Sequence, residues 1–308
     1  MSKPEMQVGG QAVIEGVMMR CKEQLTIAVR CPNQEISLHK EVLNPVANRW
    51  PLLKLPILRG VVAFIEMLFV GTRALTHSAN VALEEEEEEL TPLQLTLTVA
   101  LALTLGIGLF ILVPTIIMRF VQGLSPETSS LVFNLGEGLV RILILVGYVS
   151  AISRLSDIQR VFQYHGAEHK AVHCFEAGED LVVEKARTFS PLHPRCGTAF
   201  LLVVVFISIL LFSFFGWPGL IQRIVLRLLL LPLVAGLAYE IIKAAGKSEN
   251  PILKAIIMPG LLLQKLTTKE PDDSQIEVAL KALKGALGRE EEVEEVVTID
   301  TRGDSHAR

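Results

Sequence analysis

Long apolar runs separated by polar segments dominate the chain and predict membrane-spanning helices. A helix that crosses a bilayer needs roughly 20 mostly apolar residues. Four runs meet this length, at residues 93–118, 131–152, 198–217 and 224–242. The second run is the least uniform, because Asn134, Glu137 and Arg141 interrupt it. The pattern predicts an α-helical integral membrane protein with about four transmembrane helices.

Lys and Arg near the ends of these runs predict the orientation, since cytoplasmic flanks carry an excess of both. The connections within the two helix pairs carry only Arg119 and Arg223, whereas six Lys or Arg lie between the second and third runs. More Lys follow the fourth run. We therefore expect a multi-pass protein of the cell membrane with its middle segment and both termini in the cytoplasm.

Residues 1–55 contain short alternating runs, VIEGVMM, LTIAVR and EISLH, which predict a small antiparallel β-meander in the cytosol. Ile276, Leu280 and Leu283 follow helical spacing and predict an amphipathic helix near the C-terminus. The predicted organisation after the β-rich region is: interfacial helix and acidic linker at 56–92, transmembrane helices at 93–153, a His/Cys-rich cytoplasmic segment at 154–197, transmembrane helices at 198–245, an amphipathic region at 246–287 and a disordered acidic tail at 288–308.

Composition agrees with a bilayer as the main partner. Half of the residues are hydrophobic, 20% are charged, and the mean hydropathy is +0.45. The net charge of −4 argues against nucleic acid as a partner, because phosphate binding calls for a basic excess. Four scattered cysteines in 308 residues are too few for the disulfide framework of a small secreted protein.

Four of the seven histidines lie in residues 165–193, a concentration that favours metal binding. His165, Glu168 and His169 have the H-x-x-E-H form of inverted zinc hydrolases. On a helix, two histidines four residues apart project from one face and can bind the same ion. Glu168 is then the candidate general base, and His173 continues the stripe one turn later.

A second set of soft ligands allows a different metal site. His193 and Cys196 are three residues apart in a turn-prone HPRCG sequence, like half of a zinc knuckle. Together with Cys174 they supply three ligands, and His169 or His173 can supply a fourth. A closed site of this kind is structural, whereas a site with an open position is catalytic. The spacing of these ligands in the sequence does not distinguish a structural site from a catalytic one.

Glu240 is the candidate distant ligand of an inverted zinc-hydrolase site, because it lies well past His169, near the predicted cytoplasmic end of the fourth span. The alternative is an interfacial ion pair with Lys243.

Charged residues inside the predicted spans favour a different function. Glu137 and Arg141 are four residues apart on the second span, and Arg227 on the fourth span is another possible partner for Glu137. Ionisable residues within a bilayer mark ion and substrate pathways as well as structural pairs. These three residues therefore support a transporter as an alternative.

Four sequence blocks resemble the bacterial YqhQ family: GGQAVIEGVMMR at 9–20, YHGAEHKAVHCFEAG at 164–178, SPLHPRCGTAF at 190–200 and PGLLLQKLTTKEPDDSQIEVAL at 259–280. The resemblance extends from Gly9 to about Leu287. It implies a multi-pass membrane protein of a family without an established activity that is described as predicted metal-dependent enzymes. The positions to which it points are His165, Glu168, His169, His173, Cys174, His193 and Cys196.

The sequence thus favours a membrane protein with a cytoplasm-facing metal site, acting as a metal-dependent hydrolase on a peptide or lipid-like substrate near the inner leaflet. We expect Zn²⁺, although His, Cys and Glu ligands also accept other first-row divalent ions. The alternatives are a non-catalytic membrane scaffold or regulator with a structural zinc site, and the transporter. No specific substrate or protein partner is indicated.

Overall fold

The computed structural model of the chain describes residues 8–83, 91–125, 127–194, 196–245, 250–289, 295–300 and 305–307. Its N-terminal part is the expected antiparallel meander of four strands, in which each strand pairs with the next. The strands are β1 (Val8–Val13), β2 (Gly16–Cys21), β3 (Gln24–Arg30) and β4 (Ile36–Asn44). The six glutamates at 84–89, which belong to the predicted acidic linker, lie outside the described residues.

The acidic tail differs from the predicted disorder, since two of its segments extend this sheet. Strand β5 (Glu295–Asp300) pairs in parallel with β4, and β6 (Ser305–Ala307) pairs antiparallel with β5. An edge strand presents unpaired backbone N–H and C=O groups, and the VVTI run of the tail contains the β-branched residues that favour pairing with them.

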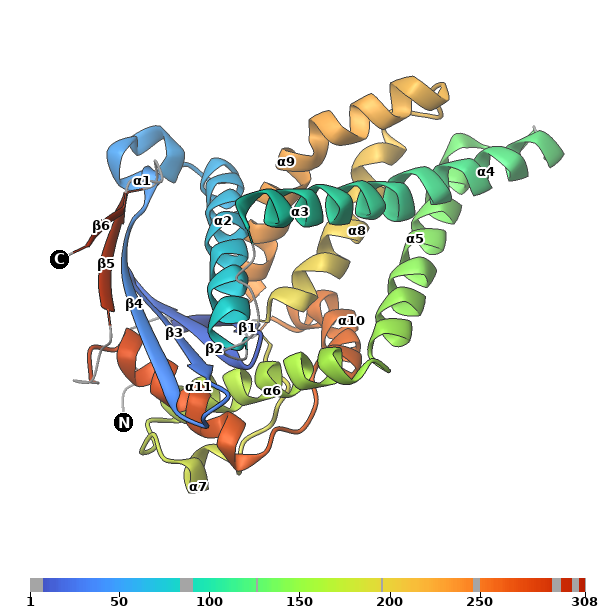
Figure 1. Cartoon of the computed structure of the whole chain (residues 1–308). Coiled ribbons are helices and arrows are strands. Elements are labelled where there is room, and N and C mark those ends of the chain that lie inside the picture. The colour runs from blue at the N-terminus through green and yellow to red at the C-terminus, as the bar shows by residue number, and fades with distance from the viewer. Residues whose placement is uncertain are drawn as a thin grey trace.

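Helices cover both faces of the sheet (Figure 1). Because side chains alternate along a strand, Val17 and Met19 of β2 pack against α6 (Ser156–Ala177) and α11 (Asp273–Ala286), whereas Met18 packs on the side of α2 (Leu58–Val81). The predicted amphipathic helix is confirmed as α11, whose apolar stripe is buried on the sheet. The sheet therefore holds α6 in a fixed position.

The run predicted as a short interfacial helix is part of α2, which has 24 residues. This helix packs between the sheet and α9 (Leu220–Ala245). Two short elements connect it to the sheet, α1 (Val46–Arg49) and the 3₁₀ helix η1 (Pro51–Lys54).

Among the described residues, three helices are long and apolar enough to cross a membrane: Thr96–Leu124, Ser130–Ile152 and Leu220–Ala245. The first joins α3 (Pro92–Ile107), a π-helical turn η2 (Gly108–Leu112) and α4 (Val113–Leu124); the others are α5 (Ser130–Ile152) and α9.

The third predicted span is shorter than expected. It is α8 (Gly197–Ser213), with 17 residues, and the chain leaves the helix before Gly216, which has a positive φ, and Pro218. The described part of the chain thus confirms three of the four predicted helices at spanning length. Helix α10 (Pro251–Thr267) packs against α8, and α7 (Val183–Ala186) packs against α6 and α11.

Helix α6 contains a glycine at its closest approach to another segment. A Cβ atom at Gly166 would lie 2.1 Å from the carbonyl oxygen of Lys269, in the linker between α10 and α11. The Lys269 N–H in turn donates to the carbonyl of Phe162 at 2.9 Å. The glycine weakens the isolated helix but lets the linker dock on it.

We predict that Gly166→Ala destabilises the protein by about 1–3 kcal/mol, because a backbone atom has to move away. Gly147→Ala is the matched control, since Gly147 also lies within a helix and its added Cβ meets nothing within 4 Å. Thermal unfolding in detergent should show a lower midpoint for Gly166→Ala alone. Equal midpoints for the two variants would contradict this account of the docking.

Candidate metal centre

The histidine-rich motif forms a stripe along α6, as the spacing predicted. The stripe faces the segment before α8, and together they form two groups of potential ligands among the described residues. One group consists of His165, His169 and Cys196, and the other consists of His173, Glu176 and His193. Within each group the donor atoms lie within 4.8 Å of one another. This distance lets the members of each group bind one ion.

Backbone carbonyls fix the orientation of all three helical histidines. Nδ1 of His165 lies 2.8 Å from the carbonyl oxygen of Thr267, and Nδ1 of His169 lies 2.5 Å from that of Pro191. Nε2 of His173 lies 2.9 Å from the carbonyl oxygen of Leu192. Because a carbonyl oxygen only accepts hydrogen bonds, each of these nitrogen atoms donates. The other nitrogen of each ring is then the one that can bind a metal, as in histidines that serve as metal ligands.

His169 carries the clearest sign of a missing ligand. Its Nε2 is buried and has no hydrogen-bond partner among the described residues. Burial also lowers the pKa of His169 well below its usual range, so the ring is neutral. A buried polar atom without a partner costs about 1–3 kcal/mol, and a cation at this nitrogen removes that cost. The residues present therefore fit a metal ion.

Cys196 brings a sulfur ligand to the first group from the start of α8. Its Sγ lies 3.1 Å from Nε2 of His165 and accepts a hydrogen bond from the N–H of Thr198 at 3.4 Å. Burial raises the pKa of the thiol to about 11. Cys196 is therefore a thiol in the absence of a metal, and binding of a metal ion at its sulfur would release the proton.

His193 completes the second group, and Gln264 of α10 holds its backbone. The Gln264 side chain accepts from the His193 N–H at 3.0 Å and donates to the His193 carbonyl at 2.9 Å. Nε2 of His193 lies 3.5 Å from a carboxylate oxygen of Glu176. Burial lowers the pKa of His193 to about 4, which keeps this ring neutral as well.

Glu168 lies beside the first group, in the position suited to a base. One of its carboxylate oxygens is 3.6 Å from Nε2 of His169. Burial raises the pKa of Glu168 to about 7, although a hydrogen bond from the backbone of Gly10 acts in the opposite direction. The protonated and ionised forms of this carboxyl group are therefore both populated near neutral pH.

Two predicted ligands lie elsewhere. Cys174 is buried in the core between α6, α11 and the sheet, where its Sγ donates to the Asp180 carbonyl at 3.3 Å. Glu240 pairs with Arg59 of α2 through two short contacts of 2.6 and 2.5 Å. Neither belongs to a potential metal group among the described residues. The structure thus joins Cys196 to the helical histidines without Cys174, and Glu240 bonds to Arg59 where the sequence suggested Lys243.

Gly10 and Gln264 support the site, although no sequence motif predicted a role for either residue there. Both lie in the sequence blocks that resemble the YqhQ family, and that resemblance is the one sequence signal that points to them. Their proximity to the histidines depends on how β1 and α10 pack against α6 and its neighbours, which local spacing does not reveal.

Comparisons with known proteins identify relatives that match most of the chain. A family model described as "Protein of unknown function (DUF1385)" matches residues 55–289. The chain is also 34% identical over 293 residues to the "Uncharacterized protein YqhQ" of Bacillus subtilis (strain 168), covering 91% of this chain and 92% of that protein. No solved structure matches the chain.

We predict that Gly10→Ala displaces Glu168, because the new Cβ would lie 2.7 Å from its Cγ and 2.9 Å from the carbonyl oxygen of Met18. We expect a loss of stability of about 1–3 kcal/mol. At Gly9 an added Cβ meets nothing within 4 Å, so Gly9→Ala is the neighbouring control. Thermal unfolding of both variants measures the difference, and an unchanged midpoint for Gly10→Ala would show that this contact is unimportant.

Proposed function

We propose that this chain, which belongs to the DUF1385 family that includes YqhQ, is a multi-pass membrane metalloprotein with hydrolytic activity. The observation that carries the proposal is the buried Nε2 atom of His169, which has a lone pair but no hydrogen-bond partner in the described structure. It lies between a cysteine, a second histidine and a carboxylate. Zn²⁺ is the ion that best fits this mixture of nitrogen, sulfur and oxygen donors.

His165, His169 and Cys196 would hold the ion. Three protein ligands leave one position of a tetrahedral site for water or substrate, which is the arrangement of catalytic zinc sites. When bound, zinc would supply Lewis acidity and make a water molecule more acidic. The neighbouring His173, Glu176 and His193 form a second potential site on the same helix.

Glu168 is the general base in this proposal. Its carboxylate is next to His169, and the backbone N–H of Gly10 orients it. A base is most effective when its pKa lies near the working pH, and burial brings Glu168 to about 7. Glu168 is buried, and its side chain lies against Gly10 of the sheet.

The membrane setting determines which substrates can reach the site. The sheet, α6 and α11 lie together at one end of the apolar helices (Figure 1). The excess of Lys and Arg in this part of the chain supports a cytoplasmic location with four spans, the short helix α8 included. A peptide or lipid-like substrate near the inner leaflet would therefore meet the histidines.

A structural zinc site in a membrane scaffold is the second candidate. The contribution of Cys196 and the burial of His169 and His193 favour it, since sulfur ligands and enclosure are typical of structural sites. The same residues would then stabilise the junction of α6, α8 and α10 without taking part in a reaction.

We predict about one zinc per chain in protein purified in detergent without chelators, and its loss in His169→Gln. His39→Gln is the control, because His39 packs on His77 of α2, on the opposite face of the sheet from α6. Metal content is measured by mass spectrometry of the purified proteins. Wild-type protein without metal, when also unable to take up added zinc, would refute both zinc proposals.

We predict that Glu168→Gln retains zinc and abolishes hydrolysis of a peptide and lipid-ester panel, since the amide cannot accept a proton. Cys196→Ser should lose zinc in either proposal. If Glu168→Gln instead keeps both zinc and the wild-type hydrolysis rate, Glu168 is not the base. If wild-type protein holds zinc tightly and hydrolyses none of the panel, the structural role is favoured.

A further inference from the structure

A buried charged cluster lies among the apolar helices and shares no residue with the two histidine groups. Glu137 of α5 is its centre and forms ion pairs with Arg141 of the same helix, at 2.9 Å, and with Arg227 of α9. Thr115 of α4 donates to Glu137 at 2.9 Å. Arg223 of α9 approaches the same carboxylate at 3.8 Å.

The cluster contains more positive than negative charge. Three arginines face one glutamate, so two positive charges remain uncompensated among the described groups. Arginine stays protonated in proteins. The side chains of Arg141, Arg223 and Arg227 are at most 10% exposed, and the Nε atom of each has no hydrogen-bond partner in the described structure. Uncompensated buried charge is costly, so an anion is the expected partner.

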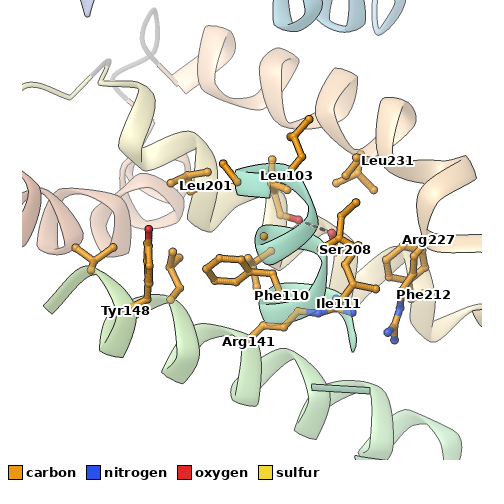
Figure 2. Close-up of a pocket in the computed structure, with 18 residues that line it drawn as sticks. Leu103, Phe110, Ile111, Arg141, Tyr148, Leu201, Ser208, Phe212, Arg227 and Leu231 are labelled. Atoms are coloured by element: carbon orange, nitrogen blue, oxygen red, sulfur yellow. Dashed lines mark hydrogen bonds between the residues drawn. The ribbon is translucent and has the colours of Figure 1, made fainter. Parts of the chain in front are cut away.

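A cavity of about 500 Å³ adjoins two of these arginines (Figure 2). Arg141, Arg227 and Phe212 lie at one end, and Tyr148 and Leu201 lie at the other. Along α8, the lining extends from Leu201 to Phe212, which corresponds to about 16 Å of helix. Apart from the arginines and the hydroxyl groups of Ser208 and Tyr148, the lining is apolar. The cavity therefore suits a long apolar chain with a negative group at one end.

The cavity is accessible from the side of the helices. Leu103, Leu231 and Leu201 line it, and each is about half exposed: 56%, 45% and 46%. Leu103 and Leu231 lie on helices of membrane-spanning length, where exposed apolar side chains face lipid. A lipid can therefore enter laterally, whereas a soluble anion would need to pass the apolar lining.

We propose that this cavity binds an anionic phospholipid, with its phosphate against Arg141 and Arg227 and one acyl chain along α8. Guanidinium groups match phosphate oxygens in charge and planar geometry, and basic pockets between membrane helices bind anionic head groups. The site shares no residue with the proposed metal centre, so the lipid proposal can be tested independently of zinc binding.

The experiment titrates delipidated full-length protein in detergent with phosphatidylglycerol or phosphatidylcholine of identical acyl chains, with bound lipid counted by native mass spectrometry. We expect phosphatidylglycerol to bind at least about tenfold more tightly, because only its net negative charge offsets the arginines. Arg141→Gln should lose this preference. Arg154→Gln is the matched control, since it removes the same charge from an exposed position on the surface, where Arg154 bonds the Ser150 carbonyl.

A second variant tests the cavity without altering the arginines. Val205→Trp fills the lining with a larger side chain and should weaken phosphatidylglycerol binding. Size-exclusion profiles and thermal unfolding report whether each variant is folded. Equal binding of the two lipids, or an unchanged preference in Arg141→Gln, would overturn the proposal. Complete competition by inorganic phosphate, together with normal binding by Val205→Trp, would identify a site for a small anion and exclude the lipid.

Discussion

Three backbone carbonyl oxygens determine what the histidine stripe can do. The carbonyls of Pro191, Leu192 and Thr267 each accept from one helical histidine, so each ring presents a chosen nitrogen to its neighbours. Without them, either tautomer would be equally available, and the rings would rotate to satisfy their own hydrogen bonds. With them, the lone pairs of His165 and His169 stay in place beside Cys196 and Glu168. The chemistry of the site thus depends on the irregular segment before α8 and on the C-terminal end of α10.

The segment before α8 and the linker after α10 are positioned by contacts with the apolar helices and with α6, which packs on the sheet. Gln264 of α10 holds the His193 peptide, and the linker that follows α10 docks at Gly166 of α6. From the opposite side, Gly10 of β1 contacts Glu168, so the sheet fixes the carboxylate. Helix α6 is therefore held between the sheet and the apolar helices. The two groups of potential metal ligands therefore depend on the packing of the sheet against the apolar helices, and the candidate site is part of the junction between them.

The sequence predicted local features well because they depend on spacing. The i, i+4 positions of His165 and His169 place both on one helical face in any context, and the meander and α11 follow from alternation and helical periodicity. Sequence spacing does not predict which distant segment of the chain will pack against a given helix face. The return of the chain before α8 brings Cys196 to the histidines and leaves Cys174 in the core. Arg59, which is 181 residues from Glu240 in the sequence, forms the ion pair with the Glu240 carboxylate. The tail strands likewise depend on the free edge of β4.

Helix α8 relates the metal centre to the cavity. Cys196 caps its N-terminus, and Leu201, the first residue of α8 that lines the cavity, lies about 7 Å further along the axis. The arginines lie at the far end of the cavity, beside Phe212. A lipid bound with its phosphate at Arg141 and Arg227 would therefore point its acyl chain, and not its phosphate or ester groups, towards the histidines. That orientation would separate the two proposed sites chemically, because the phosphate and ester groups of a lipid in the cavity would stay away from Glu168, and a substrate of the proposed metal centre would have to reach Glu168 by another route.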